Sequence, residues 1–124
     1  MLEKIIKGIK YCLNEETMTA EVIAKRNGYE GDIIIPETVV FKKVSYLVTN
    51  IDEHAFYNCK SLKIIAIPSN AIIVERGAFF DCDSLRAIRY GGTAEQWHWR
   101  YMYWDDYSFH KKTVHCIDGD VTIR

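Results

Sequence analysis

The sequence contains an internal repeat, and a repeat restricts the fold of a chain more than any other pattern. Residues 51–69 read IDEHAFYNCKSLKIIAIPS and residues 74–92 read VERGAFFDCDSLRAIRYGG, so that Ile51 corresponds to Val74 and Phe56 to Phe79. The matching positions are mostly apolar or small, whereas the differing positions are mostly polar. Stacked units show this pattern because they share their inward-facing side chains and vary the outward ones. We therefore predict a solenoid in which Phe56 and Phe79 stack between coils.

Residues 62–72 follow the pattern L-x-x-L-x-L-x-x-N-x-L, which is typical of leucine-rich repeats. It predicts a short strand with inward-facing Leu62, Ile65 and Ile67, followed by a bend where Asn70 satisfies backbone groups. An earlier, degenerate copy places Ile33 in the position that Ile65 has in the later one, which makes this coil longer than the next. We attribute its extra length to residues 41–49, which read as an added strand or hairpin arm. Residues 54–59 and 77–82 are short, and we expect one turn of α- or 3₁₀-helix in each.

The two ends differ from the repeats. Residues 9–13 and 17–24 alternate in polarity around residues 14–16, which predicts a β-hairpin that covers the first coil, followed by a turn at Asn27 and Gly28. Thr93 and Gln96 have the spacing of a helix capping box. An aromatic cluster follows in residues 97–109, and two short strands are then predicted around a type I′ turn at residues 118–119.

The repeat from Ile51 to Pro68, I-x-x-x-A-F-x-x-C-x-S-L-x-x-I-x-I-P, resembles the BspA-type leucine-rich repeat. Residues 90–97 and 114–120 resemble elements that follow such arrays. The resemblance implies a bacterial cell-surface or secreted protein that adheres to host proteins or other cells, with no shared enzymatic activity. The N-terminus does not have the pattern of a secretory signal, because lysines interrupt its apolar residues, so a cytoplasmic location stays open beside the surface location.

The expected fold is therefore an α+β single domain over residues 1–124. We expect a short leucine-rich-repeat solenoid of about two to three coils in residues 30–92. Residues 1–29 would form an N-terminal β-hairpin cap, and residues 93–124 an aromatic-rich C-terminal cap. Stacked repeats need such ends, because a terminal coil cannot bury its outer face by itself.

Composition and spacing argue against several functions. The formal net charge of −1 gives no overall field for nucleic acid, and no apolar run approaches the length of a membrane span. The cysteines and histidines lack the spacing of a zinc site, and the acidic residues 118–120 lack the oxygens of an EF-hand loop. His115 and Cys116 are adjacent in a predicted strand, so their side chains point to opposite faces. We therefore expect no enzyme activity, cofactor or metal.

The favoured function is protein binding through an exposed strand face and the aromatic tail. The candidate partner-binding residues are Ile34, Lys63, Ile64, Ala66, Arg86, Arg89, Trp99, Tyr101, Tyr103 and Trp104. Mixed apolar and basic side chains suit an acidic peptide or another chain, and the alternative is a solvated sheet face. The tail aromatics suit either cap packing, to which we assign Trp97, or a partner or sugar surface. Self-association into a homo-oligomer through incompletely covered coil ends or edge strands is a further alternative. Cys59 and Cys82 are interpreted as stacked, buried thiols, with a disulfide as the alternative.

Overall fold

The computed structural model describes residues 1–70, 72–101 and 112–123. Most of the regular structure in these residues is β-strand, with one eight-residue helix. The elements are β1 (Leu2–Ile6), β2 (Ile9–Asn14), β3 (Thr19–Val22), β4 (Gly31–Ile34), β5 (Thr38–Phe41), β6 (Val44–Ile51), β7 (Leu62–Ile67), β8 (Ile73–Val74), β9 (Ala87–Tyr90), α1 (Ala94–Tyr101), β10 (Thr113–Cys116) and β11 (Gly119–Thr122).

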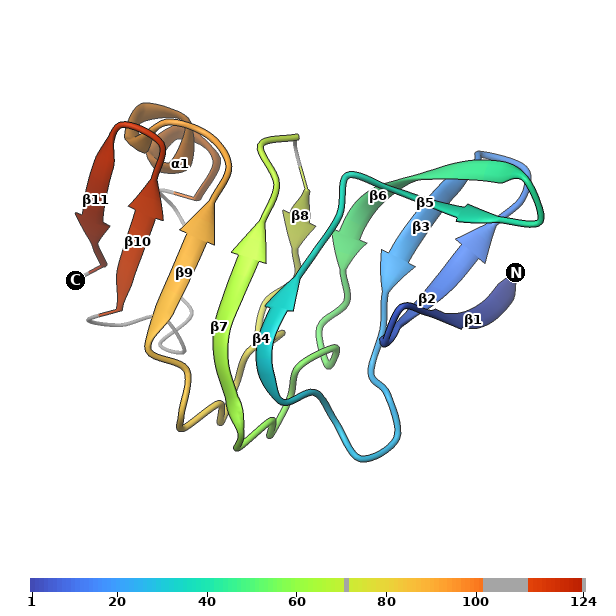
Figure 1. The fold of residues 1–124 in the computed structure, drawn as a ribbon, viewed down its shortest axis with the longest axis horizontal. Helices are drawn as coiled ribbons and strands as arrows, with labels where there is room; N and C mark the ends of the chain where they lie inside the picture. The colour runs from blue at the N-terminus through green and yellow to red at the C-terminus, as the bar shows by residue number, and fades with distance from the viewer. Residues whose placement is uncertain (71, 102–111, 124) are drawn as a thin grey trace.

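One sheet is the stacked face of a solenoid. Its strand order is β11-β10-β9-β7-β4, and the pairs β4–β7, β7–β9 and β9–β10 are parallel (Figure 1). Ile33, Ile65, Ile88 and Val114 occupy one register position across these strands, and the last three are fully buried. The predicted alignment of the degenerate first copy with the later copies is thus confirmed. The structure is a β-solenoid of about three turns.

The second sheet combines the N-terminal strands with the return strands of the coils. Its order is β1-β2-β3-β6-β5, and β8 also pairs with β6. Ile51 of β6 lies opposite Val74 of β8, as the repeat predicts. The inserted segment forms a hairpin of β5 and β6, whose turn residues Lys42 and Lys43 have positive φ, as a type I′ turn requires. The β2–β3 hairpin is confirmed, whereas β1 was not predicted.

The segments between the two sheets are turns and not helices, which corrects our expectation of a helical turn at residues 54–59 and 77–82. Asn58 and Asp81 have positive φ (59° and 62°), and this backbone conformation interrupts a right-handed helix. The segments instead bond to each other, because the Phe56 and Asn58 amides donate to Ala78 and Phe80. These hydrogen bonds join successive coils on the side away from the stacked sheet.

An aromatic stack forms the centre of the core. The rings of Phe56 and Phe79 lie parallel, with centroids 4.8 Å apart and an interplanar angle of 5°, which confirms the predicted stacking. Tyr29 lies 4.7 Å from Phe56 and continues the stack toward the N-terminal strands. Asn70 acts at the bend as predicted, since its side-chain amide donates to the Val48 carbonyl at 3.2 Å. Buried residues of the β2–β3 hairpin and of all coils form one continuous core.

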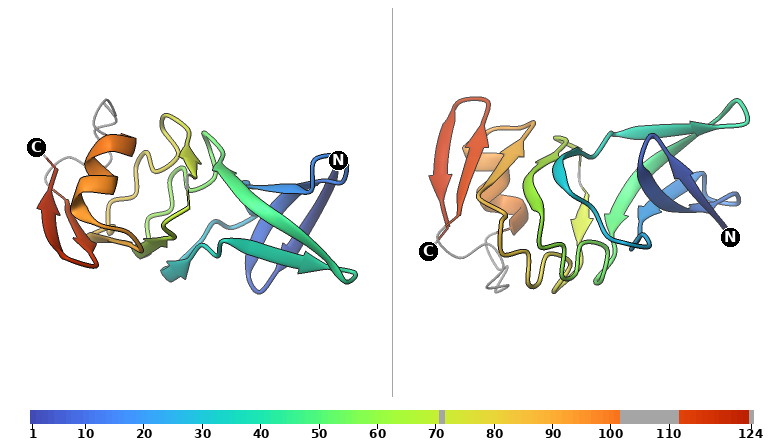
Figure 2. Two further views of the ribbon diagram at one scale, coloured as in Figure 1. Left: turned by 90° about the horizontal axis from the view of Figure 1, so that it is seen from above. Right: turned by 60° about the horizontal axis from the view of Figure 1, so that its bottom comes forward.

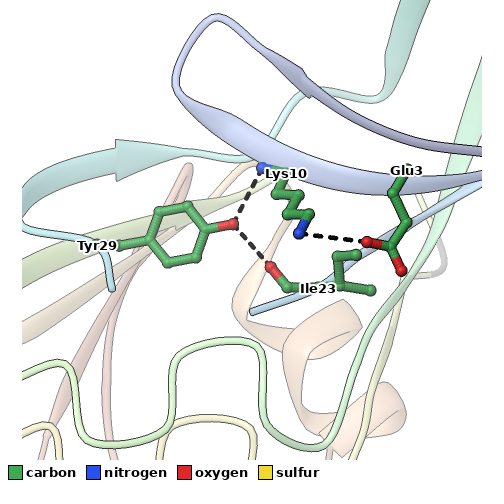
Figure 3. A network of polar contacts seen from close by, with 4 residues as sticks. All are labelled: Glu3, Lys10, Ile23 and Tyr29. Carbon is green, nitrogen blue, oxygen red and sulfur yellow. Dashed lines mark hydrogen bonds and ion pairs between the residues drawn. The ribbon is translucent and has the colours of Figure 1, made fainter. Parts of the chain in front are cut away.

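Tyr29 also joins the N-terminal hairpin to this core through its hydroxyl group (Figure 3). The hydroxyl accepts a hydrogen bond from the Lys10 amide at 3.0 Å and donates one to the Ile23 carbonyl at 2.7 Å. Lys10 in turn forms an ion pair with Glu3 of β1 at 3.2 Å. A single side chain therefore contacts the first coil with its ring and the backbone of the hairpin with its hydroxyl group.

The C-terminal part of the described chain begins with the predicted capping box. The Thr93 hydroxyl accepts the Gln96 amide at 3.1 Å, and the Gln96 side chain accepts the Thr93 amide at 2.8 Å. Trp97 is 4% exposed and packs against Tyr90 of β9, so α1 lies on the inner side of the stacked sheet (Figure 2). The helix is too short to cross a membrane, and no other helix is present in the described residues.

The last two strands, β10 and β11, form the predicted hairpin, but its turn differs from the expectation. The turn residues are Ile117 and Asp118, and neither has positive φ. A type I′ turn requires positive φ at both positions, so that assignment is wrong. Gly119, with φ of 145°, instead begins the returning strand.

An acidic cluster lies where β3, β6 and β8 meet. Burial, a hydrogen bond with Asp52 and the charges of Asp52 and Glu75 raise the pKa of Glu21 to about 6. The Asn50 side-chain amide donates to Glu75 at 3.1 Å. Glu21 therefore holds its proton more firmly in the folded chain than its ordinary pKa of 4.5 would allow.

Candidate binding face

The outward side chains of β4, β7, β9 and β10 form one surface, which we call the outer face. Because these strands are parallel and in register, outward residues of equal position make rows across the sheet. One row runs Ile34, Ala66, Arg89 and His115. Ile34 is 73% exposed, Ala66 is half-buried, and Arg89 and His115 are exposed. The predicted residues Ile34, Ala66 and Arg89 are thus adjacent, although they are far apart in sequence.

Lys63 and Arg86 lie before this row, near the start of their strands. The Arg86 amide donates to the Lys63 carbonyl at 3.0 Å, and both side chains are exposed. Across residues 1–70, 72–101 and 112–123, neither of them nor Arg89 forms an ion pair within 4.0 Å. Their positive charges are therefore available to a partner.

A shallow groove of about 330 Å³ lies at the C-terminal ends of β4, β7 and β9, on the side of this row away from Lys63 and Arg86. Its walls are largely apolar, with Arg89 and Glu37 as the charged members, and consist of Ile34, Ile35, Pro36, Glu37, Ala66, Ile67, Pro68, Arg89, Tyr90 and Gly91. Pro36, Glu37 and Pro68 were not among the residues predicted from the sequence. The equivalent positions of the two prolines after β4 and β7 could have revealed them, since equivalent repeat positions become neighbours in a solenoid.

Ile64 departs from the prediction, because only 8% of it is exposed and it cannot offer a large contact surface. It lies on β7 between Asp32 of β4 and Ala87 of β9, which share its register position. Flanking strands on both sides restrict solvent access to a side chain in the middle of a sheet. Alternation along a strand predicts which way a side chain points but does not predict what its neighbours cover.

The aromatic candidates separate into two environments. Trp99 is 68% exposed, whereas Tyr101 is half-buried and packs on Trp97 with ring centroids 4.4 Å apart. The Tyr101 hydroxyl donates to the Ile72 carbonyl at 2.9 Å, and burial raises the pKa of this phenol to about 12. Tyr101 therefore packs against Trp97 and is less accessible than Trp99. Tyr103 and Trp104 lie outside the described residues.

The His115 ring of this face lies 2.9 Å from the Asp120 carboxylate of β11, and both side chains are exposed. Within the part of the chain that the structure describes, no group of three or more His, Cys, Asp or Glu side chains could hold a metal ion. The geometry of this face, with an apolar groove next to exposed cations, suits recognition of another molecule.

Comparison with solved structures gives two bacterial relatives of this fold. A leucine-rich cell-surface protein from Faecalibacterium prausnitzii A2-165 is 26% identical, with a TM-score of 0.61 over 73% of this chain. A leucine-rich repeat protein from Bacteroides ovatus ATCC 8483 is 28% identical, with a TM-score of 0.57 over 69% of this chain. The matches span 24% and 23% of those two chains. No curated protein sequence matches.

A family model supplies the remaining comparison. The model described as "BspA type Leucine rich repeat region (6 copies)" matches residues 36–113, which is more than half of the chain. The match includes both clear repeats, the β5–β6 hairpin and α1. It agrees with the parallel register of β7 and β9, whose alignment the repeat spacing predicted independently. The chain therefore belongs to the BspA-type leucine-rich repeat family.

Proposed function

We propose that this chain is a protein-binding module whose outer face takes an extended segment of a partner protein. The observation that supports this most directly is the juxtaposition of exposed Ile34, the groove beside it and the exposed side chain of Arg89. An apolar partner side chain would lie in the groove, and acidic residues of the same segment would face Arg86 and Arg89. Aromatic and apolar anchors supply affinity at such surfaces, and charges at the rim guide association.

The test uses an array of synthetic extended peptides that combine apolar and acidic residues, with charge-inverted peptides of the same pattern as the reference. We expect the acidic peptides to bind and Arg89→Glu to weaken binding at least tenfold. Arg26→Glu makes the same charge change at an exposed residue outside the face and is the matched control. The proposal fails if the acidic and basic peptides bind equally, or if both variants lose the same affinity.

We also propose that the chain acts at the cell surface or in secreted form, in adhesion to host or neighbouring-cell proteins. The support is family membership together with a structural relative whose description places it at the cell surface. Antibody labelling of intact against permeabilised cells tests the location, and labelling that needs permeabilisation would refute it. Adhesion is tested by measuring binding of the chain to immobilised matrix proteins, and we expect Arg89→Glu to bind more weakly than the wild-type chain.

Carbohydrate binding is a second candidate, and the exposure of Trp99 favours it. Exposed indole rings stack on sugar rings, and the indole of Trp99 has no role in the buried packing of α1. Replacing Trp99 by Phe and titrating a panel of glycans distinguishes this function by tryptophan fluorescence. Unchanged fluorescence in the wild-type chain across the panel would exclude it.

A further inference from the structure

A second hollow lies at the opposite side of the coils, where the turn segments meet the loop after β3. It has a volume of about 470 Å³ and is lined by parts of residues 24–30 and 54–61. Polar and charged side chains are common in its walls, and they include Lys25, His54 and Asn58. One cysteine, Cys59, also lines it. This hollow shares no residue with the outer face.

Cys59 lines the hollow although it is only 4% exposed. Its sulfur accepts a hydrogen bond from the Tyr29 amide at 3.4 Å. Gly28, with φ of 72°, brings its backbone so close that a side-chain carbon there would lie 3.3 Å from the same sulfur. The loop thus places a backbone donor directly against a sulfur atom that borders the hollow.

Cys82 occupies the equivalent position in the next coil, so the thiol of Cys59 does not stand alone. The Cys82 thiol donates a hydrogen bond to the Phe56 carbonyl at 3.0 Å, and each of the two thiols affects the pKa of the other. The hydrogen bond from the Asn58 amide to the Phe80 carbonyl pairs the two backbones just before the cysteines. This pairing sets Cys59 and Cys82 at equivalent positions of adjacent coils, and a disulfide between them requires such neighbouring backbones.

The electrostatic environments of the two thiols differ. The hydrogen bond with Cys82, the Tyr29 amide and the charge of Lys25 lower the pKa of Cys59, against the opposing effect of burial. The same hydrogen bond and burial raise the pKa of Cys82. The pair therefore contains one sulfur that borders the hollow and has a lowered pKa, and one that is not part of the hollow's walls and has a raised pKa. A thiolate is the nucleophile in disulfide exchange.

We propose that Cys59 and Cys82 form a dithiol site that is oxidised by small organic disulfides entering the hollow. The Cys59 thiolate attacks one sulfur of the disulfide RSSR, forms a mixed disulfide and releases the first thiolate RS⁻. Cys82 then gives its proton to RS⁻, and its sulfur attacks Cys59 and releases the second RS⁻, which takes up the proton that Cys59 lost to solvent. The protein dithiol is oxidised to one disulfide, and RSSR is reduced to two RSH molecules. The product joins two successive coils covalently.

The experiment uses the folded chain and 2-hydroxyethyl disulfide, with acid quenching and mass spectrometry of the intact chain and of its non-reduced peptides. We expect the wild-type chain to lose two hydrogen atoms and to give a linked Cys59–Cys82 peptide. Cys82→Ser should stop at a single hydroxyethylthio group on Cys59, and Cys59→Ser should leave Cys82 unmodified. Modification of Cys82 in the Cys59→Ser chain, at the rate of the wild-type reaction, would overturn the order of attack.

The wild-type chain also contains an internal control, which keeps the test decisive if a variant does not fold. Cys116 is a half-buried thiol whose pKa is raised by burial and by Asp118 and Asp120. At mildly acidic pH we expect Cys59 to react at least tenfold faster than Cys116. The proposal is wrong if Cys116 reacts first, or if Cys59 and Cys82 react only after urea has unfolded the chain.

Discussion

Replacement of Phe56 by alanine is the perturbation that the structure predicts most clearly. Phe56 is fully buried, and its ring lies between Tyr29 at 4.7 Å and Phe79 at 4.8 Å. Truncation of a buried phenylalanine costs about 3–5 kcal/mol, and each aromatic pair contributes about 0.5–1.5 kcal/mol beyond area burial. Because part of the pair energy is already included in the truncation cost, we expect the free energy of unfolding to fall by about 4–5 kcal/mol. Domains are commonly stable by only about 5–15 kcal/mol, so this variant should be close to unfolding.

Urea denaturation followed by circular dichroism measures this loss, provided that the dependence on urea concentration stays unchanged. Phe80→Ala is the matched control, because it removes the same side chain from the neighbouring position, where the ring is 49% exposed. The control should cost about 1 kcal/mol or less. The double-mutant cycle of Phe56→Leu and Phe79→Leu should show a coupling of about 0.5–1.5 kcal/mol. Equal losses for the two alanine variants would refute the assignment of Phe56 to the centre of the core.

Three further predictions concern pH, the helix start and the cap. Because the pKa of Glu21 is raised from 4.5 to about 6, the folded chain binds more protons than the unfolded chain between these values, so stability should fall as pH rises through them. Glu21→Gln should remove that fall in urea titrations at several pH values, and an unchanged pH profile would contradict it. Thr93→Ala should lower the free energy of unfolding by about 1 kcal/mol, because it removes the N-cap side chain of α1. A loss near zero in thermal unfolding would show that the capping box does not stabilise the chain. Tyr101→Phe should lower the free energy of unfolding by about 1 kcal/mol, because it removes the hydrogen bond to the Ile72 carbonyl. Trp99→Ala should leave the free energy of unfolding nearly unchanged, because Trp99 is 68% exposed. A larger loss for Trp99→Ala than for Tyr101→Phe would contradict both expectations.

The repeat was the most informative part of the sequence. The correspondence of residues 51–69 with residues 74–92 predicted which apolar residues share a register position, and Ile65 and Ile88 do so. The longer offset of the degenerate first copy likewise placed Ile33 beside Ile65. Periodicity works here because each coil repeats the same contacts with its neighbour, so one correct alignment determines several long-range pairs.

Local backbone conformation was less predictable. The expected helical turns failed at Asn58 and Asp81, whose positive φ follows from bonds between coils that a single segment does not reveal. The hairpin turn at Ile117 and Asp118 lies earlier than expected for a similar reason, because the pairing of β10 with β9 limits where β10 can end. Strand β1 was missed because its alternation is weak.

The candidate face could be predicted in part. Alternation showed that Ile34, Ala66 and Arg89 point outward, and the structure places them in one row. It did not show that Ile64 is shielded, since burial depends on the neighbouring strands. It also did not reveal the hollow at Cys59, because Tyr29 reaches that position only through the loop after β3.

The position of Tyr29 has a consequence for how the chain opens. Its ring covers Phe56, and its hydroxyl group holds the Lys10 amide and the Ile23 carbonyl (Figure 3). Separation of the N-terminal hairpin from the first coil would break both hydrogen bonds and expose a fully buried phenylalanine. Hydrogen exchange at the Lys10 amide, which donates to the Tyr29 hydroxyl, should therefore report this separation. At this end of the array, opening therefore begins with separation of the whole hairpin from the first coil, and not with a single strand.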